Sequence, residues 1–294
     1  MGRIIAIANQ KGGVGKTTTA INLAVALAQS GRRVLFIDID PQGNATSGLV
    51  SAPHIREAIA RGSSVYEALL GGVPIVEVIQ EVRPGLMLAG ASQDLVGAEI
   101  EMATTEGRER RLQRLIEVVS QEYNYVLIDT PPSLGLLTLN ALVAADSVLV
   151  PMQCEYYALE GLGSLLGTIK RVREALAPRL EVEGLVLTMF DSRNRLSHEI
   201  ASEVRRHFPD KVFRAVIPRN VRLSESPSHG LSALEYEAKS SGAQAYRELA
   251  EELIARTTAG GAAQADSAIG AHHQEGSHHD SHEQHHRRSE DEEG

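Results

Sequence analysis

The 294-residue sequence is poor in cysteine and in aromatic residues. It has one cysteine, Cys154, no tryptophan and only 4% aromatic residues. A single cysteine excludes an intrachain disulfide and a zinc or iron–sulfur site built from the cysteines of one chain. Few aromatic residues disfavour base stacking on single-stranded nucleic acid as the function.

Long apolar runs are also missing. The most apolar stretch, residues 134–152, is interrupted by Asp146 and falls short of the ~18–20 residues of a membrane span. The apolar run at residues 3–8 is too short for a secretory signal, because Asn9, Gln10 and Lys11 follow it directly. We therefore expect a cytoplasmic protein with no membrane partner.

The net charge of −9 is unevenly distributed. Residues 266–294 contain eight acidic residues and two arginines, and seven of the eleven histidines lie between His272 and His286. From Thr257 onward Ile269 is the only large aliphatic residue, so this segment has too little apolar surface for a core. We predict a folded domain at residues 1–256 and a disordered, acidic, histidine-rich tail at residues 257–294.

The window at residues 193–222 has the opposite character, with eight basic and three acidic residues. Two interpretations are open: a helix with a solvated basic face, or a surface that contacts a polyanion such as DNA. Because most of the negative charge lies in the tail, the acidic total does not exclude DNA.

Short apolar segments alternate with segments of helical periodicity along residues 3–256. This alternation is typical of βαβ units, which build a mostly parallel sheet with helices on both faces. The sequence thus predicts an α/β fold. The expected strands are residues 3–8, 33–38, 85–89, 125–129, 147–151, 184–190 and 212–217, and the expected helices are residues 18–29, 63–70, 108–121, 136–145, 157–177, 197–207 and 242–256.

A glycine-rich turn, QKGGVGKTT at residues 10–18, joins the first strand to the first helix. Backbone N–H groups of such a turn, with the positive end of the helix dipole, bind phosphates. Lys16 is placed to reach the β- and γ-phosphates, and the Thr17 hydroxyl to bind Mg²⁺. Gln10 stands where the usual pattern has glycine, and Lys11 adds a second lysine, which is the deviant Walker A form of a P-loop.

Three aspartates end two of the predicted strands. Asp38 and Asp40 follow one strand, and Asp129 ends another. The carboxyl ends of parallel strands share one edge of the sheet, where the glycine-rich turn also lies. Three carboxylates beside a polyphosphate require a cation, so we expect Asp38 and Asp129 to bind Mg²⁺ through water and Asp40 to position the attacking water or act as a base.

Five sequence motifs resemble the ParA/Soj family of chromosome-partitioning ATPases over nearly all of residues 3–256. The motifs are KGGVGKTTTAINLA, FIDIDPQGNAT, VLIDTPPS, CEYYALEGL and IPRNVRLSESPSHG. The resemblance implies a P-loop NTPase fold of the deviant Walker type, ATP and Mg²⁺ as cofactors, and ATP hydrolysis that supports chromosome or plasmid segregation.

The resemblance also implies roles for single residues. Lys11 would reach the phosphates of a partner subunit in an ATP-dependent homodimer, and Gly12 would lie at the close contact between the two subunits. Lys11, Lys16 and Asp40 would be the catalytic residues. The nucleotide would contact Lys11, Gly12, Gly13, Val14, Gly15, Lys16, Thr17 and Thr18, with Pro218 and Asn220 at the adenine, and Thr17, Asp38 and Asp129 would hold the metal.

Two arginines and one protein partner complete the implied machinery. Arg193 and Arg222 would bind double-stranded DNA without sequence preference in the dimer, which places the protein on the nucleoid. A ParB-type centromere-binding protein would stimulate hydrolysis and release.

Two alternatives remain open at this point. The chain could be a related MinD/ParA-like ATPase that positions another cargo; a membrane-bound version is disfavoured because the last helix is not followed by a basic amphipathic one. A metal-insertion NTPase would explain the histidine-rich tail, but such proteins are GTPases and the guanine-binding N-K-x-D motif is missing.

Overall fold

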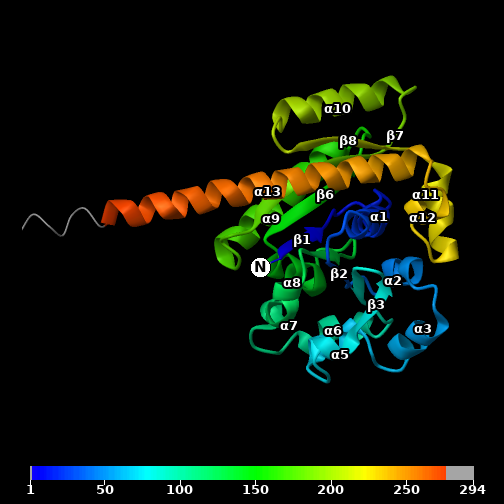
Figure 1. Cartoon of the computed structure of the whole chain (residues 1–294), viewed down its shortest axis with the longest axis vertical. Helices are drawn as coiled ribbons and strands as arrows, with labels where there is room; N and C mark the ends of the chain where they lie inside the picture. The colour runs from blue at the N-terminus through cyan, green and yellow to red at the C-terminus, as the bar shows by residue number, and fades with distance from the viewer. Residues whose placement is uncertain (1, 276–294) are drawn as a thin grey trace, which may run out of the picture. The chain divides into compact units, whose positions relative to one another are not determined.

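The computed structural model describes residues 2–275 of the chain (Figure 1). It divides into two units, one up to Glu252 and one from Leu253. The first unit contains the sheet and the elements that surround it. The second contains the C-terminal part of one long helix.

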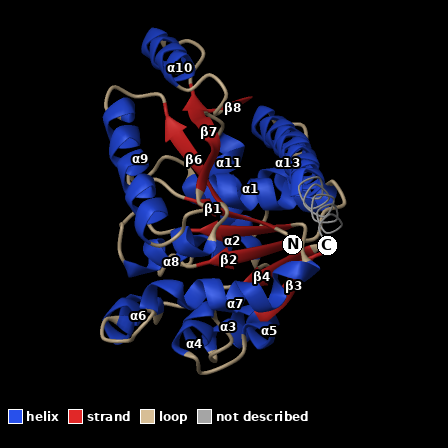
Figure 2. Cartoon of the chain, turned by 90° about the vertical axis from the view of Figure 1, so that its left-hand side faces the viewer, coloured by secondary structure: helices blue, strands red, loops and turns tan. Residues whose placement is uncertain are grey.

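An eight-stranded sheet forms the centre of the first unit (Figure 2). Its strand order is β3-β4-β2-β5-β1-β6-β7-β8, and every neighbouring pair is parallel except β3 and β4. The predicted mostly parallel sheet is therefore confirmed. The strands are β1 Arg3–Ile7, β2 Val34–Asp38, β3 Ile79–Arg83, β4 Leu86–Ala89, β5 Tyr125–Asp129, β6 Ser147–Gln153, β7 Glu181–Phe190 and β8 Val212–Pro218.

The central strands β1, β2 and β5 are apolar except at their ends, because both faces of the sheet are covered. Side chains alternate between the faces, so Ile4 and Ala6 of β1 belong to one large core cluster, whereas Ile5 and Ile7 point to the opposite face. Helices α7, α8 and α9 contribute to that cluster, and α1 contacts β1, β2 and β5 from the other side.

Of the seven predicted helices, all but the last start and end within three residues of the predicted positions, whereas six further helices of four to eight residues in the described part of the chain were not predicted. Their bounds are α1 Lys16–Gln29, α2 Asn44–Leu49, α3 Pro53–Ala60, α4 Val65–Leu70, α5 Ile75–Val78, α6 Leu95–Met102, α7 Arg111–Val119, α8 Leu136–Ala144, α9 Ala158–Ala175, α10 Arg195–His207, α11 Val221–Glu225, α12 Ala233–Tyr236 and α13 Ser241–Glu275. Short 3₁₀ turns lie at η1 Arg108–Arg110, η2 Ser120–Glu122 and η3 Ser226–His229.

The last helix differs from the prediction. The sequence predicts its end at Arg256, but α13 continues to Glu275. Residues 257–275 contain six alanines, the residue with the highest helix propensity, together with three glycines, which have a low one. Residues 276–294 lie outside the described residues, so the proposed tail there, and the division of the chain at residue 256, stay predictions.

Candidate nucleotide-binding site

The glycine-rich turn forms a phosphate-binding loop between β1 and α1. Gly13 and Gly15 have φ angles of +73° and +84°, a left-handed conformation in which glycine is favoured. The Thr188 hydroxyl at the end of β7 donates a 2.7 Å hydrogen bond to the Val14 carbonyl and fixes the loop from outside. The loop therefore has the strand–turn–helix setting in which backbone N–H groups bind phosphate.

Lys16, the first residue of α1, is 7% exposed. Its ammonium lies 3.4 Å from the Lys11 carbonyl oxygen, so its side chain folds back over the loop. Burial lowers the pKa of Lys16, and the carboxylates of Asp129 and Asp40 act in the opposite direction. A buried cation at the start of a helix is a strong attractor for a phosphate group.

Asp129 is fully buried, and neither of its carboxylate oxygens has a hydrogen-bond partner among the described residues. Burial and the neighbouring Asp38 raise its pKa well above the usual range, whereas the Thr17 hydroxyl and the Lys16 ammonium favour the charged form. An orphaned buried carboxylate beside a phosphate-binding loop fits a site that is completed by a cation. Oxygen donors from Asp and Thr are the ligands that Mg²⁺ prefers.

Asp38 lies beside Asp129, since the two residues are paired in the register of β2 and β5. Its carboxylate accepts hydrogen bonds from the Thr46 backbone N–H at 2.8 Å and the Thr46 hydroxyl at 2.7 Å. Burial raises the pKa of Asp38 to about 6, although these hydrogen bonds act against the shift. Asp38 is thus held by α2, and its expected contact with the metal through water stays a prediction.

Asp40 is 6% exposed and accepts a 3.0 Å hydrogen bond from the Gln42 backbone N–H. Its side chain faces a cavity of about 580 Å³ that begins at the phosphate-binding loop. Pro218 and Asn220, the two residues that the resemblance assigns to the adenine, line the same cavity. The remaining lining residues include Gly12, Gly13, Gly15, Thr17, Thr18, Gln42, Asn44, Thr188, Met189, Leu223, Pro227 and Tyr246.

Two positions in the wall of this cavity are structurally unusual. Met189 has a φ of +48°, a conformation rare for a residue with a side chain. The buried Tyr246 shares a 3.1 Å hydrogen bond with the Thr19 hydroxyl of α1, so the first part of α13 is fastened to the phosphate-binding helix. The cavity thus has a wall made by segments far apart in sequence.

Lys11 and Gly12 lie on the outer side of the loop. The Lys11 ammonium forms an ion pair with Glu155, and both side chains are 43% exposed. A Cβ atom added at Gly12 would meet no atom of the chain within 4 Å. The fold itself therefore does not demand glycine at this position.

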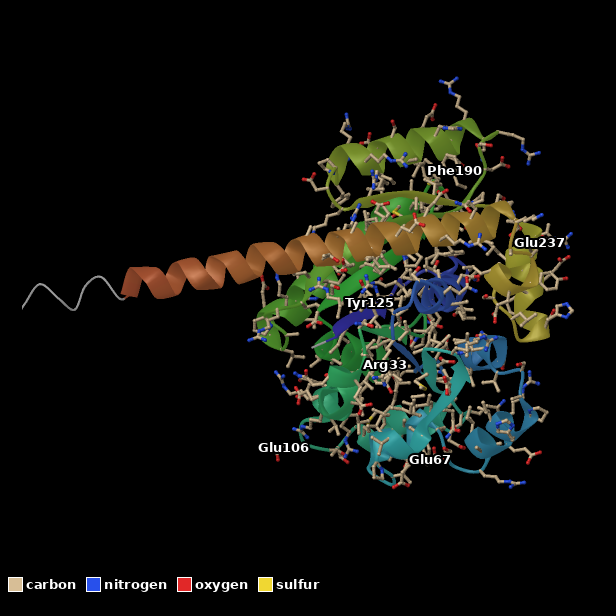
Figure 3. The ribbon with its side chains drawn as sticks, in the orientation of Figure 1. Arg33, Glu67, Glu106, Tyr125, Phe190 and Glu237 are labelled. Atoms are coloured by element: carbon tan, nitrogen blue, oxygen red, sulfur yellow. The ribbon has the colours of Figure 1, made fainter. Side chains whose placement is uncertain are left out.

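Arg193 and Arg222 follow strands that end at the same edge of the sheet. β7 and β8 are neighbours, with Phe190 opposite Pro218, and each arginine follows shortly after one of these strands. Figure 3 labels Phe190, whose ring packs edge-on against His198 of α10 with centroids 5.1 Å apart. The sheet topology thus brings the segments that carry the two arginines to the carboxyl ends of the neighbouring strands β7 and β8.

The basic window is more nearly neutral in the structure than in the sequence. Five of its eight basic side chains lie within 4 Å of a carboxylate, and the window spreads over α10, β8 and α11 rather than one helix face. The pairs are Arg193–Asp191, Arg195–Glu199, Arg206–Glu203, Arg214–Glu252 and Arg222–Glu225.

Several contributors to the site escape sequence reasoning. Thr46 lies in a six-residue helix with no clear periodicity, and Thr188 and Tyr246 reach the loop from distant segments. Their types carry no signal of their own, because a threonine or a buried tyrosine occurs throughout protein cores. Glu155 could have been found only from the motif that contains it.

The described part of the chain contains no cluster of metal ligands and no helix suited to a membrane. Among the side chains that the structure describes, no three of His, Cys, Asp or Glu gather in a cluster suited to a metal ion. Nor does any helix within residues 2–275 combine the length and apolar character needed to cross a membrane. Metal binding by the histidine-rich segment stays a prediction, because its side chains lie outside those described.

A parallel sheet, a loop of the deviant Walker A form, and acidic residues at the adjoining strand ends define a P-loop NTPase. Residues 2–182 match the AAA domain family. The chain is 54% identical over 257 residues to the chromosome partitioning protein ParA of Caulobacter vibrioides, covering 86% of this chain and 94% of that protein. It is 51% identical over 257 residues to the sporulation initiation inhibitor protein Soj of Bacillus subtilis, covering 87% and 99%.

Among solved structures, the fold is similar to a cobyrinic acid a,c-diamide synthase from Mycobacterium smegmatis with bound ATP analogue and magnesium. The TM-score is 0.76 and the identity 38%, over 88% of this chain and 97% of that one. The chain belongs to the ParA/Soj family. It is a partitioning ATPase.

Proposed function

We propose that this ATPase segregates DNA by forming an ATP-dependent homodimer that binds duplex DNA without sequence preference. A ParB-type partner stimulates hydrolysis, and the dimer then separates and leaves the nucleoid. The observation that carries the proposal is the cavity itself: it is lined both by the phosphate-binding loop and by Asn220, which caps the helix that carries Arg222.

The nucleotide is ATP with Mg²⁺. Lys16 and the N–H groups of residues 12–18 bind the phosphates, Thr17 and Asp129 hold the metal, and Asp38 does so through water. When bound, Mg²⁺ neutralises charge on the phosphate oxygens. The unpartnered oxygens of Asp129 support this assignment, because a buried carboxylate with no hydrogen bond is costly unless a cation compensates it.

Asp40 positions the attacking water for hydrolysis. Its backbone is fixed by a 3.1 Å hydrogen bond from its N–H to the Asp38 carboxylate, and its side chain by the Gln42 N–H. Its carboxylate therefore faces the cavity in a defined orientation. Phosphoryl transfer depends mainly on the alignment of the reacting groups and on charge. We therefore expect Asp40 to accelerate hydrolysis more by aligning the water than by acting as a base.

Lys11 and Gly12 form the dimer contact. Lys11 lies on the outer side of the loop, where it can leave Glu155 and reach the phosphates of a partner subunit. The open space around Gly12 supports a second chain as the reason for glycine there. Positive charge supplied in this way from another subunit is what an arginine finger does in other NTPases.

Arg193 and Arg222 contact the DNA phosphates. Their side chains are 87% and 49% exposed. Contacts to phosphate carry no sequence information and weaken steeply with salt. A dimer presents each arginine twice.

The proposal is tested by sedimentation of the purified chain with Mg²⁺ and ATP or ADP. We expect a dimer with ATP and a monomer with ADP, and Lys11→Ala should be monomeric in both. Lys170→Ala is the matched control, because Lys170 is an exposed lysine on α9 that pairs with Glu174 and is remote in sequence from the loop. A Lys11→Ala variant that dimerises as the wild type does would contradict the role of Lys11.

A further inference from the structure

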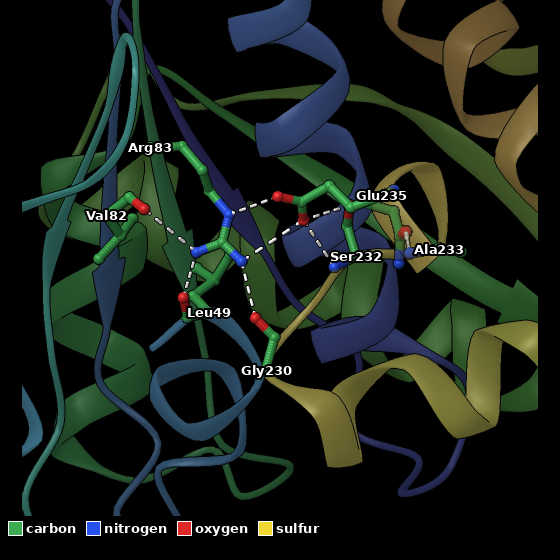
Figure 4. Close-up of polar contacts among 8 residues, drawn as sticks. Leu49, Val82, Arg83, Gly230, Ser232, Ala233 and Glu235 are labelled. Carbon is green, nitrogen blue, oxygen red and sulfur yellow. Dashed lines mark hydrogen bonds and ion pairs between the residues drawn. The ribbon is translucent and has the colours of Figure 1, made fainter. Parts of the chain in front are cut away.

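Arg83, the last residue of β3, joins three separate segments of the chain (Figure 4). Its guanidinium donates to the Glu235 carboxylate, with Nε 2.9 Å from Oε1, and to the Gly230 carbonyl at 2.7 Å. It also donates to the Leu49 carbonyl. The Arg83 and Glu235 side chains are only 13% and 22% exposed, so this pair is largely shielded from solvent.

Glu235 also makes hydrogen bonds at the start of α12. Its carboxylate accepts hydrogen bonds from the Ser232 N–H at 2.9 Å and the Ser232 hydroxyl at 2.8 Å, which completes a capping box. Because the same carboxylate binds Arg83, the helix start and the end of β3 are held together. The Arg83 guanidinium contributes to lowering the pKa of Glu235, so the pair is ionised at neutral pH.

The segments that Arg83 joins form two walls of the nucleotide cavity, and α2 and η3 also pack directly against each other. Leu49 ends α2, which begins with the cavity residue Asn44 and carries Thr46, the partner of Asp38. Gly230 follows η3, which contains the cavity residue Pro227. Arg83 does not line the cavity itself, so it influences nucleotide binding only through these walls.

A series of hydrogen bonds also connects the same cluster to α1, the helix that follows the phosphate-binding loop. The Ala233 N–H at the start of α12 donates a 2.8 Å hydrogen bond to the side-chain oxygen of Asn22 in α1. The Asn22 amide in turn donates to the Thr18 carbonyl at 2.8 Å. Asn22 is 2% exposed and Thr18 lines the cavity. Hydrogen bonds thus link the Arg83 cluster to Thr18 of the phosphate-binding loop through Asn22.

We propose that Arg83 is a positioning residue for the nucleotide: it fastens the segment after Asp40 to the segment on the adenine side and keeps the cavity in its binding-competent form. This inference rests on the proposed function only in requiring that the chain binds ATP. Without Arg83 the two walls separate in part of the population, and the apparent affinity falls by the fraction that remains competent.

The test is equilibrium binding of a fluorescent ATP analogue with Mg²⁺, at a temperature where circular dichroism shows every variant folded. Arg83→Ala should bind at least about fivefold more weakly than the wild type. The matched control is Arg3→Ala, which removes a partly buried pair with Glu183 between β1 and β7, at 2.9 Å, remote from the cavity walls. Arg3→Ala should lower the unfolding temperature but keep the affinity within about twofold of the wild type.

Glu235→Gln gives a second, milder variant. The guanidinium keeps its bonds to the carbonyls of Leu49 and Gly230, so the loss of affinity should lie between those of the wild type and Arg83→Ala. If Arg83→Ala binds the ATP analogue as tightly as the wild type, the inference is wrong but the proposed function stands. The same holds if Arg3→Ala loses as much affinity as Arg83→Ala. A wild-type chain that binds no ATP overturns the inference and the proposed function together.

Discussion

Replacing Asp129 by Asn should stabilise the nucleotide-free protein and remove most of its stabilisation by Mg²⁺ and ATP. Asn has the shape of Asp but no charge, and neither oxygen of Asp129 has a hydrogen bond to lose among the described residues. The substitution therefore isolates the charge of this buried carboxyl. Few positions in the chain allow so clean a comparison.

The size of the stabilisation follows from the raised pKa. A carboxyl whose pKa is higher in the folded than in the unfolded state favours folding at low pH, and this contribution is lost as the pH rises through the folded pKa. Between the two pKa values the wild type loses about 1.4 kcal/mol per pH unit from this one group. The Asp129→Asn variant has no carboxyl to titrate at this position. The difference between its free energy of unfolding and that of the wild type should therefore increase at this rate above about pH 4.

Mg²⁺ and ATP should reverse the order of stability. At a nucleotide concentration of about 100 times its Kd, binding stabilises the wild type by about 2.7 kcal/mol. For a folded domain of this size that corresponds to an increase in Tm of about 5–10 °C. The Asp129→Asn variant lacks the carboxylate that we propose to hold the metal, so its Tm should increase only slightly.

The assay is thermal and urea unfolding from about pH 5 to pH 8, with and without Mg²⁺ and ATP. Asp210→Asn, which changes an exposed aspartate, is the control and should follow the wild type throughout. An Asp129→Asn variant less stable than the wild type at the upper end of this pH range without nucleotide would refute the reasoning. So would a full increase in its Tm with Mg²⁺ and ATP.

Three further substitutions test the other parts of the site. Asp40→Ala should bind ATP and dimerise but hydrolyse at least about 100-fold more slowly, and a phosphate-release assay at the wild-type rate would contradict its role. Arg222→Glu should lose DNA in a filter-binding assay and still dimerise with ATP; if dimerisation fails too, the arginine is structural. Glu155→Gln frees Lys11 from a half-exposed ion pair worth about 0.2–1 kcal/mol, so sedimentation should show dimers at up to about fivefold lower protein concentration. A weaker dimer would mean that Glu155 itself contributes to the contact.

The central architecture could be predicted from the sequence because its signals are local. Five consecutive apolar residues followed by a glycine-rich turn and a helix identify β1, the loop and α1, and the same reasoning identifies β5 with Asp129 at its end. The edge strand β3 escapes, since IQEVR has neither a continuous apolar run nor strict alternation. Its antiparallel pairing depends on β4, which a local pattern cannot reveal.

The site is only half predictable for the same reason. Lys16 and the aspartates lie in motifs whose spacing defines their chemistry. Arg83 has no such motif: it meets Glu235 across 152 positions of sequence, and only the folded chain places the two side chains together. The full length of α13 cannot be predicted from an apolar pattern, because Ile269 is the only large aliphatic residue in residues 257–275.

The central claim is that ATP switches the chain into a DNA-binding form, and one measurement tests it most directly. Binding of a duplex of arbitrary sequence should be measured with ATP, with ADP and without nucleotide, over a series of salt concentrations. We predict binding with ATP only, and an affinity that falls as a power of the salt concentration, with one counterion released for roughly each phosphate contacted. Equal affinity in all three states, or binding insensitive to salt, would contradict the account.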